Sequence, residues 1–406
     1  MAETIRTTHV GSLPRPTALI EENIALQKGE LDRGEFDQRL QSHINDVVAQ
    51  QLEAGIDLVN DGEYGKPMVE EIEPTAWVYY AWHRFDGLGF AEHRDGVMPN
   101  PNEVPGKYDE PELTTYANRR DYSAFKDAYL SDPYNAGIMA ALDNPTAPAI
   151  VKEVTYVGQD AVRADAEGLR SALAAAGAEG RGFISSISPG MLSSMGNAHY
   201  ESRHDAGMAL AGELNKEYRA IVDAGHTLQI DAPDLADSWD QMNPEPTVEE
   251  YLKYVRHSVE EINESIKGID RDKVRIHICW GSWHGPHTTD IPFDDIVDTV
   301  FEANAGAFSF EAANPRHAWE WKIWKNRTLP KGIKLIPGVI SHNTNIVEHP
   351  ETVAQSIIRF AEFVGPENVI ASTDCGLGGR LHSQLAWAKL RALGEGAQLA
   401  EKYMGL

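Results

Sequence analysis

The chain has 406 residues, and its composition already limits what it can be. Hydrophobic residues make up 42% and charged residues 24%, which is typical of a globular protein and excludes collagen-like or wholly disordered chains. Lys and Arg total 36 against 62 Asp and Glu, so the formal net charge is −26. Such a surface repels nucleic-acid phosphates and anionic lipid, and we expect neither nucleic-acid nor membrane partners.

Two further features narrow the class of protein. No apolar run approaches the ~18 residues that a membrane span needs, and the first residues lack the basic and then apolar pattern of a signal peptide. We therefore expect a cytoplasmic protein. Only two cysteines are present, which is too few for a disulfide scaffold of this size.

Apolar runs typical of strands alternate with amphipathic helices along the chain. Strands are predicted at residues 5–12, 56–62, 182–188, 227–231, 274–280, 307–311, 335–340 and 368–373. Helices are predicted from apolar residues at helical spacing within 40–52, 210–222, 248–266 and 353–364, each closed by a following glycine. Eight strands separated by helices predict one α/β domain over residues 1–406, a (β/α)8 TIM barrel. A doubly wound parallel sheet is the alternative.

Residues 74–155 interrupt this alternation. They are rich in Trp, Tyr, Pro and Asp, and include Trp77, Tyr79, Tyr80 and Trp82. Loops of this length are usually functional or disordered, and so many aromatic residues argue against disorder. We predict an aromatic-rich insertion after the second strand that covers the barrel mouth. The alternative is an arm for subunit contact, which would make the protein a homo-oligomer.

Chemistry-bearing residues stand at the carboxyl ends of the predicted strands, where barrel enzymes place their active sites. His277 and Cys279 are two apart on one strand, so both can face the barrel axis. Glu311 follows one β/α unit later, and Cys375 follows two units after that. Two thiolates, an imidazole and a carboxylate form a tetrahedral zinc set. The alternative is that these are ordinary buried core and polar residues.

The ligand types indicate the chemistry of such a zinc site. Two thiolate ligands reduce the Lewis acidity of the metal and weigh against activation of water. A substrate thiol bound there loses its proton and stays nucleophilic at neutral pH, so the set favours transfer of an alkyl group to sulfur.

Six motifs in chain order resemble a known family. They are His-Val-Gly-Ser at 9–12, Asp-Gly-Glu at 61–63, Gln-Ile-Asp at 229–231, His-Ile-Cys at 277–279, Phe-Ser-Phe-Glu at 308–311 and Asp-Cys-Gly-Leu at 374–377. In this order they resemble the catalytic barrel of cobalamin-independent methionine synthase. The wider group includes zinc-dependent alkyl transferases such as epoxyalkane:coenzyme M transferase.

The resemblance implies roles for individual residues. Its zinc ligands would be His277, Cys279, Glu311 and Cys375. Glu63 and Asp231 match carboxylates that hold the amino group of homocysteine, and Ser12, with the backbone around Gly11, matches the holder of its carboxylate. His342 matches a histidine that donates a proton to the leaving group.

These expectations combine into one predicted function. We expect a zinc-dependent methyltransferase that activates a small, homocysteine-like thiol for attack on a methyl donor such as a methylated folate. The first alternative is thiol addition to an epoxide, or the reverse lyase step, at the same zinc. A decarboxylase of the same superfamily and a non-catalytic protein stabilised by zinc are the others. The alkyl donor stays open, because the insertion and the residues after Asp231 and Trp280 differ from those of the synthase.

Overall fold

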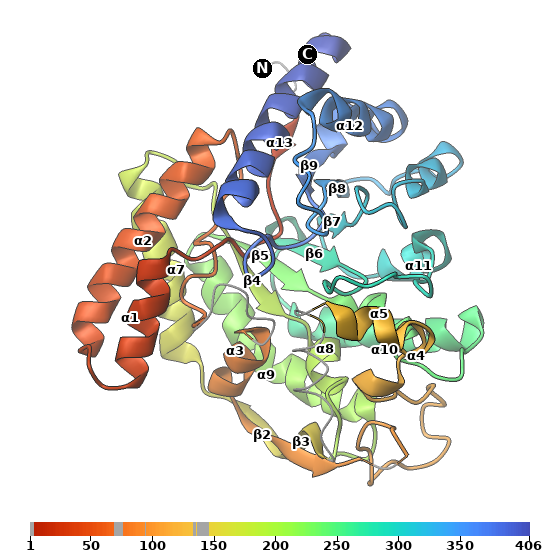
Figure 1. Ribbon diagram of the computed structural model, residues 1–406. Helices are drawn as coiled ribbons and strands as arrows, with labels where there is room; N and C mark the ends of the chain where they lie inside the picture. Colours follow the sequence, from red (N-terminus) through yellow and green to blue (C-terminus); the bar gives the residue numbers. More distant parts are fainter. Residues whose placement is uncertain (1–3, 69–75, 94, 133–134, 136–145) are drawn as a thin grey trace.

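The computed structural model describes residues 4–68, 76–93, 95–132, 135 and 146–406, with the side chains of 76–79 left out. The side chains of Trp77 and Tyr79 thus lie outside the described part. Seven parallel strands form a curved sheet in the order β1-β9-β8-β7-β6-β5-β4 (Figure 1). Their bounds are β1 Arg6–Thr7, β4 Phe183–Ile187, β5 Thr227–Asp231, β6 Val274–Ile278, β7 Ala307–Phe310, β8 Lys334–Ile340 and β9 Ile370–Thr373.

The gap between β1 and β4 is closed by residues 57–59. The amides of Asp57 and Leu58 both donate to the carbonyl of Thr7, at 3.1 and 3.0 Å. Val59 then forms a parallel bridge with Gly182, immediately before β4. The predicted second strand therefore occupies its place in the barrel, but only as a bridge. The predicted α/β barrel is confirmed, and the doubly wound sheet is excluded because β1 and β4 are joined through this segment.

Helices cover the outer face of the barrel. The longer ones are α1 Thr17–Gln27, α2 Arg33–Glu53, α7 Gln159–Ala175, α9 Arg203–Asp223, α10 Val248–Ser265, α11 Phe293–Val300, α12 Pro350–Val364 and α13 Ser383–Met404. The four predicted helices correspond to α2, α9, α10 and α12. Helix α10 begins with a capping box, in which Thr247 and Glu250 satisfy each other's backbone amides. Its buried face includes Tyr251, Val255 and Ile262.

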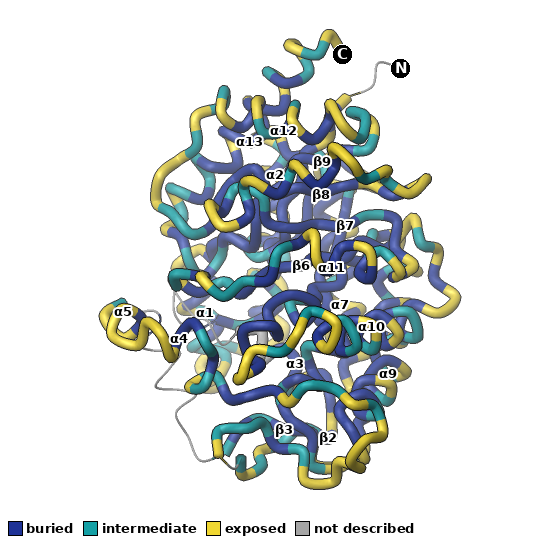
Figure 2. The backbone as a smooth tube through the Cα atoms, turned by 90° about the vertical axis from the view of Figure 1, so that its right-hand side faces the viewer, coloured by how far each residue is buried: buried dark blue, intermediate teal, exposed yellow. Residues whose placement is uncertain are grey.

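The strands are buried on both faces, as parallel strands under helices must be. All five residues of β6 are buried, with Ile276 on one side and Arg275 and His277 on the other. Figure 2 shows this buried interior inside a partly exposed shell of helices. Among the described helices, none is long and apolar enough to cross a membrane.

The segment predicted as an insertion has regular structure of its own. A two-stranded antiparallel sheet pairs β2 Phe85–Glu92 with β3 Thr146–Tyr156, and it lies beside α9 (Figure 1). Helices α3 Ala76–Arg84, α4 Arg120–Ala124 and α5 Lys126–Ser131 are short. The low periodicity of this sequence hid these elements, because short strands and helices leave little repeat to detect.

Candidate metal and thiol site

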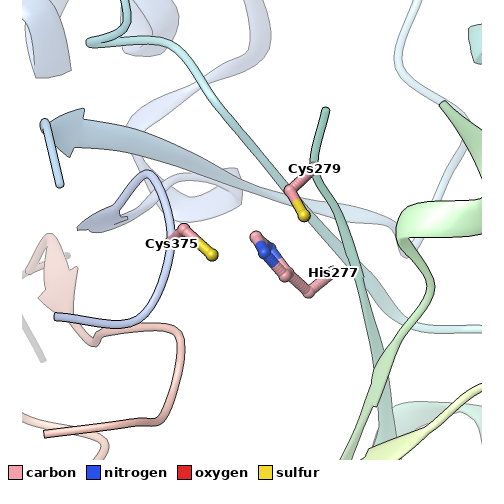
Figure 3. A group of neighbouring side chains, drawn as sticks. All are labelled: His277, Cys279 and Cys375. Carbon is pink, nitrogen blue, oxygen red and sulfur yellow. The ribbon is translucent and has the colours of Figure 1, made fainter. Parts of the chain in front are cut away.

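Three ligand-type side chains meet at the carboxyl end of the barrel. His277 lies on β6, Cys279 directly follows that strand, and Cys375 follows β9. Their ligand atoms all lie within 4.8 Å of one another, and all three residues are buried. Figure 3 shows the side chains pointing toward a common space from these separate segments. Neither cysteine forms a disulfide.

The imidazole of His277 makes a hydrogen bond through only one of its two nitrogens. Its Nδ1 lies 3.2 Å from the Ser309 hydroxyl on the neighbouring strand β7, its register partner. Its Nε2 is buried and has no hydrogen-bond partner among the described residues. A histidine held through one ring nitrogen with the other free is typical of metal ligands. Together with two thiols, this unpaired nitrogen fits a thiophilic divalent ion such as Zn²⁺.

The pKa values of the Cys279 and Cys375 thiols shift in opposite directions. Hydrogen bonding to Cys279 lowers the pKa of the Cys375 thiol well below its usual range, although burial opposes the shift. The same contact raises the pKa of Cys279 well above its usual range, with burial adding to it. The guanidinium of Arg380 also supports a Cys375 thiolate, with Nη1 3.2 Å from its Sγ. Metal binding would therefore displace a proton mainly from Cys279.

Glu311, expected as the fourth ligand, belongs to a neighbouring group. Its carboxylate lies with His342 and Asp374, whose ligand atoms are all within 4.8 Å of one another. Its Oε1 accepts a hydrogen bond from the Trp280 amide at 3.2 Å, and its Oε2 accepts one from Asn314 at 2.9 Å. Glu311 is thus held beside the three-residue cluster by the residue that follows Cys279. Its role as a ligand stays a prediction.

The carboxylate of Asp374, which follows β9, holds the loop after β7 in place through hydrogen bonds. It accepts hydrogen bonds from the backbone amides of Ala312, Ala313 and Asn314 at 2.8, 2.9 and 2.7 Å. These three bonds fix the loop after β7, which carries Glu311, against the residue before Cys375. Asp374 therefore has a structural explanation and need not bind a metal.

His342 follows β8 and is completely buried. Burial lowers its pKa to about 3, so the imidazole is neutral near pH 7. Both ring nitrogens lack hydrogen-bond partners among the described residues. A buried ring whose two nitrogens make no hydrogen bond destabilises the folded protein unless a ligand supplies the missing hydrogen bonds. The position beside Glu311 and Asp374 places this ring at the edge of the cluster.

The predicted substrate-binding residues lie around the end of β1. Gly11 has a φ of +145°, and a Cβ there would lie 2.6 Å from Glu63 Oε1 and 2.7 Å from Ser185 Oγ. Only glycine allows this approach. The carbonyl of Ser12 accepts hydrogen bonds from the amides of Leu377 and Gly378, at 2.8 and 2.9 Å. Gly11 is therefore packed against Glu63, and the Ser12 backbone is held against the loop that carries Cys375.

Asp231, at the end of β5, forms an acidic pair with Glu63. Burial raises the pKa of Asp231 to about 7; His277 opposes this shift, the nearby Glu63 adds to it, and Lys66 opposes it. Lys66 Nζ also lies 3.5 Å from Glu63 Oε1. Two buried carboxylates so close that each disfavours ionisation of the other favour a neighbouring cation.

Sequence motifs missed the residues that the insertion brings to this end of the barrel. Arg119 pairs with both carboxylate oxygens of Asp237 at 2.6 Å and lies between the rings of Tyr116 and Trp283. Asp121 accepts hydrogen bonds from the amides of the loop that follows Cys279. No local pattern signals the contacts with Asp237, Trp283 and the loop after Cys279, because these partners lie more than a hundred residues away.

The amino-acid sequence is similar to one protein family and to several characterised proteins. The family described as the catalytic domain of cobalamin-independent synthase matches residues 5–75 and 135–399, so the unmatched residues 76–134 fall inside the predicted insertion. Methionine synthase of Sulfolobus acidocaldarius is 24% identical over 380 residues, covering 91% of this chain and 85% of that protein. The 2-hydroxypropyl-CoM lyase of Xanthobacter autotrophicus is 27% identical over 230 residues, 50% of this chain and 56% of the lyase. The match thus spans little more than half the length of that lyase.

Solved structures share the fold across the whole chain. A B12-independent methionine synthase from Shewanella, solved with selenomethionine, is similar with a TM-score of 0.67 at 19% identity and covers 99% of both chains. A vitamin-B12-independent methionine synthase from Listeria monocytogenes, described as putative, gives 0.57 at 18% identity over 98% of both. The motifs, the barrel and the family match over most of the sequence agree, and the chain belongs to the cobalamin-independent synthase catalytic-domain family.

Proposed function

We propose that this protein is a zinc-dependent methyltransferase that methylates the sulfur of a small, homocysteine-like thiol. The observation that carries the proposal is the meeting of His277, Cys279 and Cys375, with an unpaired Nε2 on His277, near the acidic pair Glu63 and Asp231. The family membership and the similarity to proteins named methionine synthases support it.

The metal would be held by His277, Cys279 and Cys375, with Glu311 as the proposed fourth ligand. When bound, Zn²⁺ supplies positive charge that keeps a substrate sulfur deprotonated at neutral pH. The ammonium of the thiol substrate would lie between Glu63 and Asp231. Ser12 and the adjacent backbone would hold its carboxylate.

The reaction forms one S–C bond and breaks the bond between the methyl carbon and its carrier. The thiol gives up one proton, and the departing carrier takes one up, so the balance closes. His342 would relay that proton: one unpaired nitrogen of its neutral ring would take up a proton while the other gives one to the departing carrier. Positioning the two reactants together would contribute several kcal/mol, on the order of effects seen in intramolecular reactions.

A second candidate is thiol addition to an epoxide, or the reverse lyase step. The observation that favours it is the similarity to 2-hydroxypropyl-CoM lyase. The same three residues would serve: the sulfur would form a bond to a ring carbon, the C–O bond of that carbon would break, and the released oxygen would take up the proton that the thiol gave up.

The test combines metal analysis with assays of purified protein. We expect one zinc per chain, S-methylation of homocysteine by a methylated folate, and loss of both metal and activity in Cys279→Ser. X-ray absorption at the zinc edge should show an added sulfur ligand when homocysteine is present. Full metal content and activity in Cys279→Ser would refute the site, and turnover with an epoxide alone would favour the second candidate. An edge spectrum unchanged by thiol would favour a purely structural metal.

A further inference from the structure

A buried cation, Arg275, lies near Asp231 of the acidic pair. Arg275 is on β6, two residues before His277, and is only 3% exposed. No carboxylate of the described residues lies within ion-pair distance of its guanidinium. A buried charge without a direct counter-ion is expensive, and such groups are usually retained for a function.

The guanidinium is held by neutral groups from several strands. Its Nε donates to Gln229 Oε1 at 2.8 Å, and its Nη1 donates to the Thr8 hydroxyl at 3.0 Å. Its Nη2 donates to the carbonyl of His9 at 3.0 Å, and the group stacks 3.5 Å from the centre of the Phe183 ring. These contacts hold the Arg275 side chain in place. They also connect residues 8 and 9, which follow β1, to Gln229 on β5.

Arg275 determines which way the amide of Gln229 points. A guanidinium has only donors, so the amide oxygen of Gln229 must face it. The amide nitrogen must then face the other way, and it donates to Asp231 Oδ1 at 2.6 Å. It also lies 3.3 Å from Ser185 Oγ and contacts the carbonyl of Val10. One oxygen of Asp231 is thereby fixed, while Oδ2 accepts no hydrogen bond from the described residues.

We infer that Arg275 and Gln229 are positioning residues for the amino group of the thiol substrate. Arg275 orients Gln229, Gln229 holds Oδ1 of Asp231, and Oδ2 is left directed at the ammonium. Neither residue touches the substrate. The inference rests on the proposed function, since it names what makes that site selective for an amino thiol.

The test measures selectivity rather than activity alone. Homocysteine and 4-mercaptobutyrate differ only in the amino group, so the ratio of their dissociation constants for the zinc-loaded protein reports the ammonium site. We expect Arg275→Lys and Gln229→Met to weaken homocysteine binding about tenfold, equivalent to ~1.4 kcal/mol, and to leave 4-mercaptobutyrate binding and zinc content unchanged. Arg271→Lys is the matched control, because Arg271 precedes the same strand and, among the described residues, its side chain hydrogen-bonds only to the carbonyl of Ala305.

Equal weakening of both thiols, or no change in either, would overturn the inference. If either variant does not fold, the wild-type protein labelled with ¹⁵N-glutamine provides a second readout. The side-chain amide signal of Gln229 should shift on adding homocysteine and stay in place with 4-mercaptobutyrate, and a homocysteine titration that leaves it unmoved would equally overturn the inference. Failure of the zinc-loaded wild type to bind either thiol would instead count against the proposed function.

Discussion

Gly11 shows how much one position can decide. Its φ of +145° and the 2.6 Å from its would-be Cβ to Glu63 Oε1 leave no room for a side chain. The absence of a side chain lets the backbone before Ser12 approach Glu63. A single methyl group would therefore clash with Glu63, which is proposed to hold the amino group of the substrate, and with Ser185.

Replacing this glycine should damage binding and stability together. We expect Gly11→Ala to weaken homocysteine binding at least about tenfold and to cost about 1–3 kcal/mol of folding free energy through backbone strain. Calorimetric titration and denaturant unfolding measure the two effects. Gly212→Ala is the control, because Gly212 lies in α9 with no atom within 4 Å of its would-be Cβ. Normal binding in Gly11→Ala would contradict the proposed substrate site.

His342 should separate chemistry from binding. In His342→Gln we expect kcat to fall by about 10²–10⁴, the range for loss of a general acid, with zinc content and thiol affinity unchanged. Steady-state kinetics and metal analysis check this. The exposed His199→Gln should behave as wild type. A His342 variant with normal kcat would remove this residue from the mechanism.

At the scale of elements, the segment between β2 and β3 contacts the loop that follows Cys279, at the end of the barrel where the candidate metal ligands lie. Asp121 in α4 accepts hydrogen bonds from the amides of His287 and Thr288 at 3.1 and 2.9 Å and from the Thr288 hydroxyl at 2.6 Å. Asn135 donates to the carbonyl of His284 at 2.7 Å. These contacts fix the loop that starts at Cys279. The prediction that the segment covers bound substrates stays a prediction, as does a subunit contact.

Weakening this attachment should loosen the metal site. We expect Asp121→Asn to cost about 1–3 kcal/mol, to speed hydrogen exchange at residues 284–290 and to lower zinc affinity. Exchange mass spectrometry and a competitive chelator assay measure the two local effects. Asp127→Asn, at an exposed position of the adjacent helix α5, is the control. Unchanged exchange would show that the loop keeps its shape without Asp121.

At the scale of the whole molecule, a barrel with a net charge of −26 must pair the acids that it buries. Glu110, which precedes α4, is paired with Arg203 at 2.8 Å and with His257 at 2.5 Å, on helices α9 and α10. Burial alone would raise its pKa, but Arg203 and then His257 lower the pKa of Glu110 to about 2. The contacts of Glu110 with Arg203 and His257 thus connect the inserted segment to helices α9 and α10 on the outside of the barrel.

This pairing predicts a pH dependence of stability. The folded pKa is about 2 against an ordinary 4.5, so the unfolded chain takes up the proton first. The contribution, on the order of 3 kcal/mol, is present above pH 4.5 and is lost as the pH falls toward 2. The unfolding free energies of wild type and Glu110→Gln should therefore converge as the pH falls from about 5 toward 2. Glu249→Gln, exposed on α10, should run parallel to wild type; a constant gap for Glu110→Gln would contradict the assignment.

The sequence by itself determined the barrel. Helix and strand periods are local, and parallel strands bring their carboxyl ends together, so spacing predicted that His277, Cys279, Glu311 and Cys375 converge, and the first, second and fourth of these do so. Tertiary structure alone decided how the second strand closes the barrel and that Glu311 lies with His342 and Asp374. It also decided that Arg275 orients Gln229 and that Asp121 holds the loop after Cys279. These are contacts between side chains far apart in the chain, and their geometry depends on packing that no local pattern encodes.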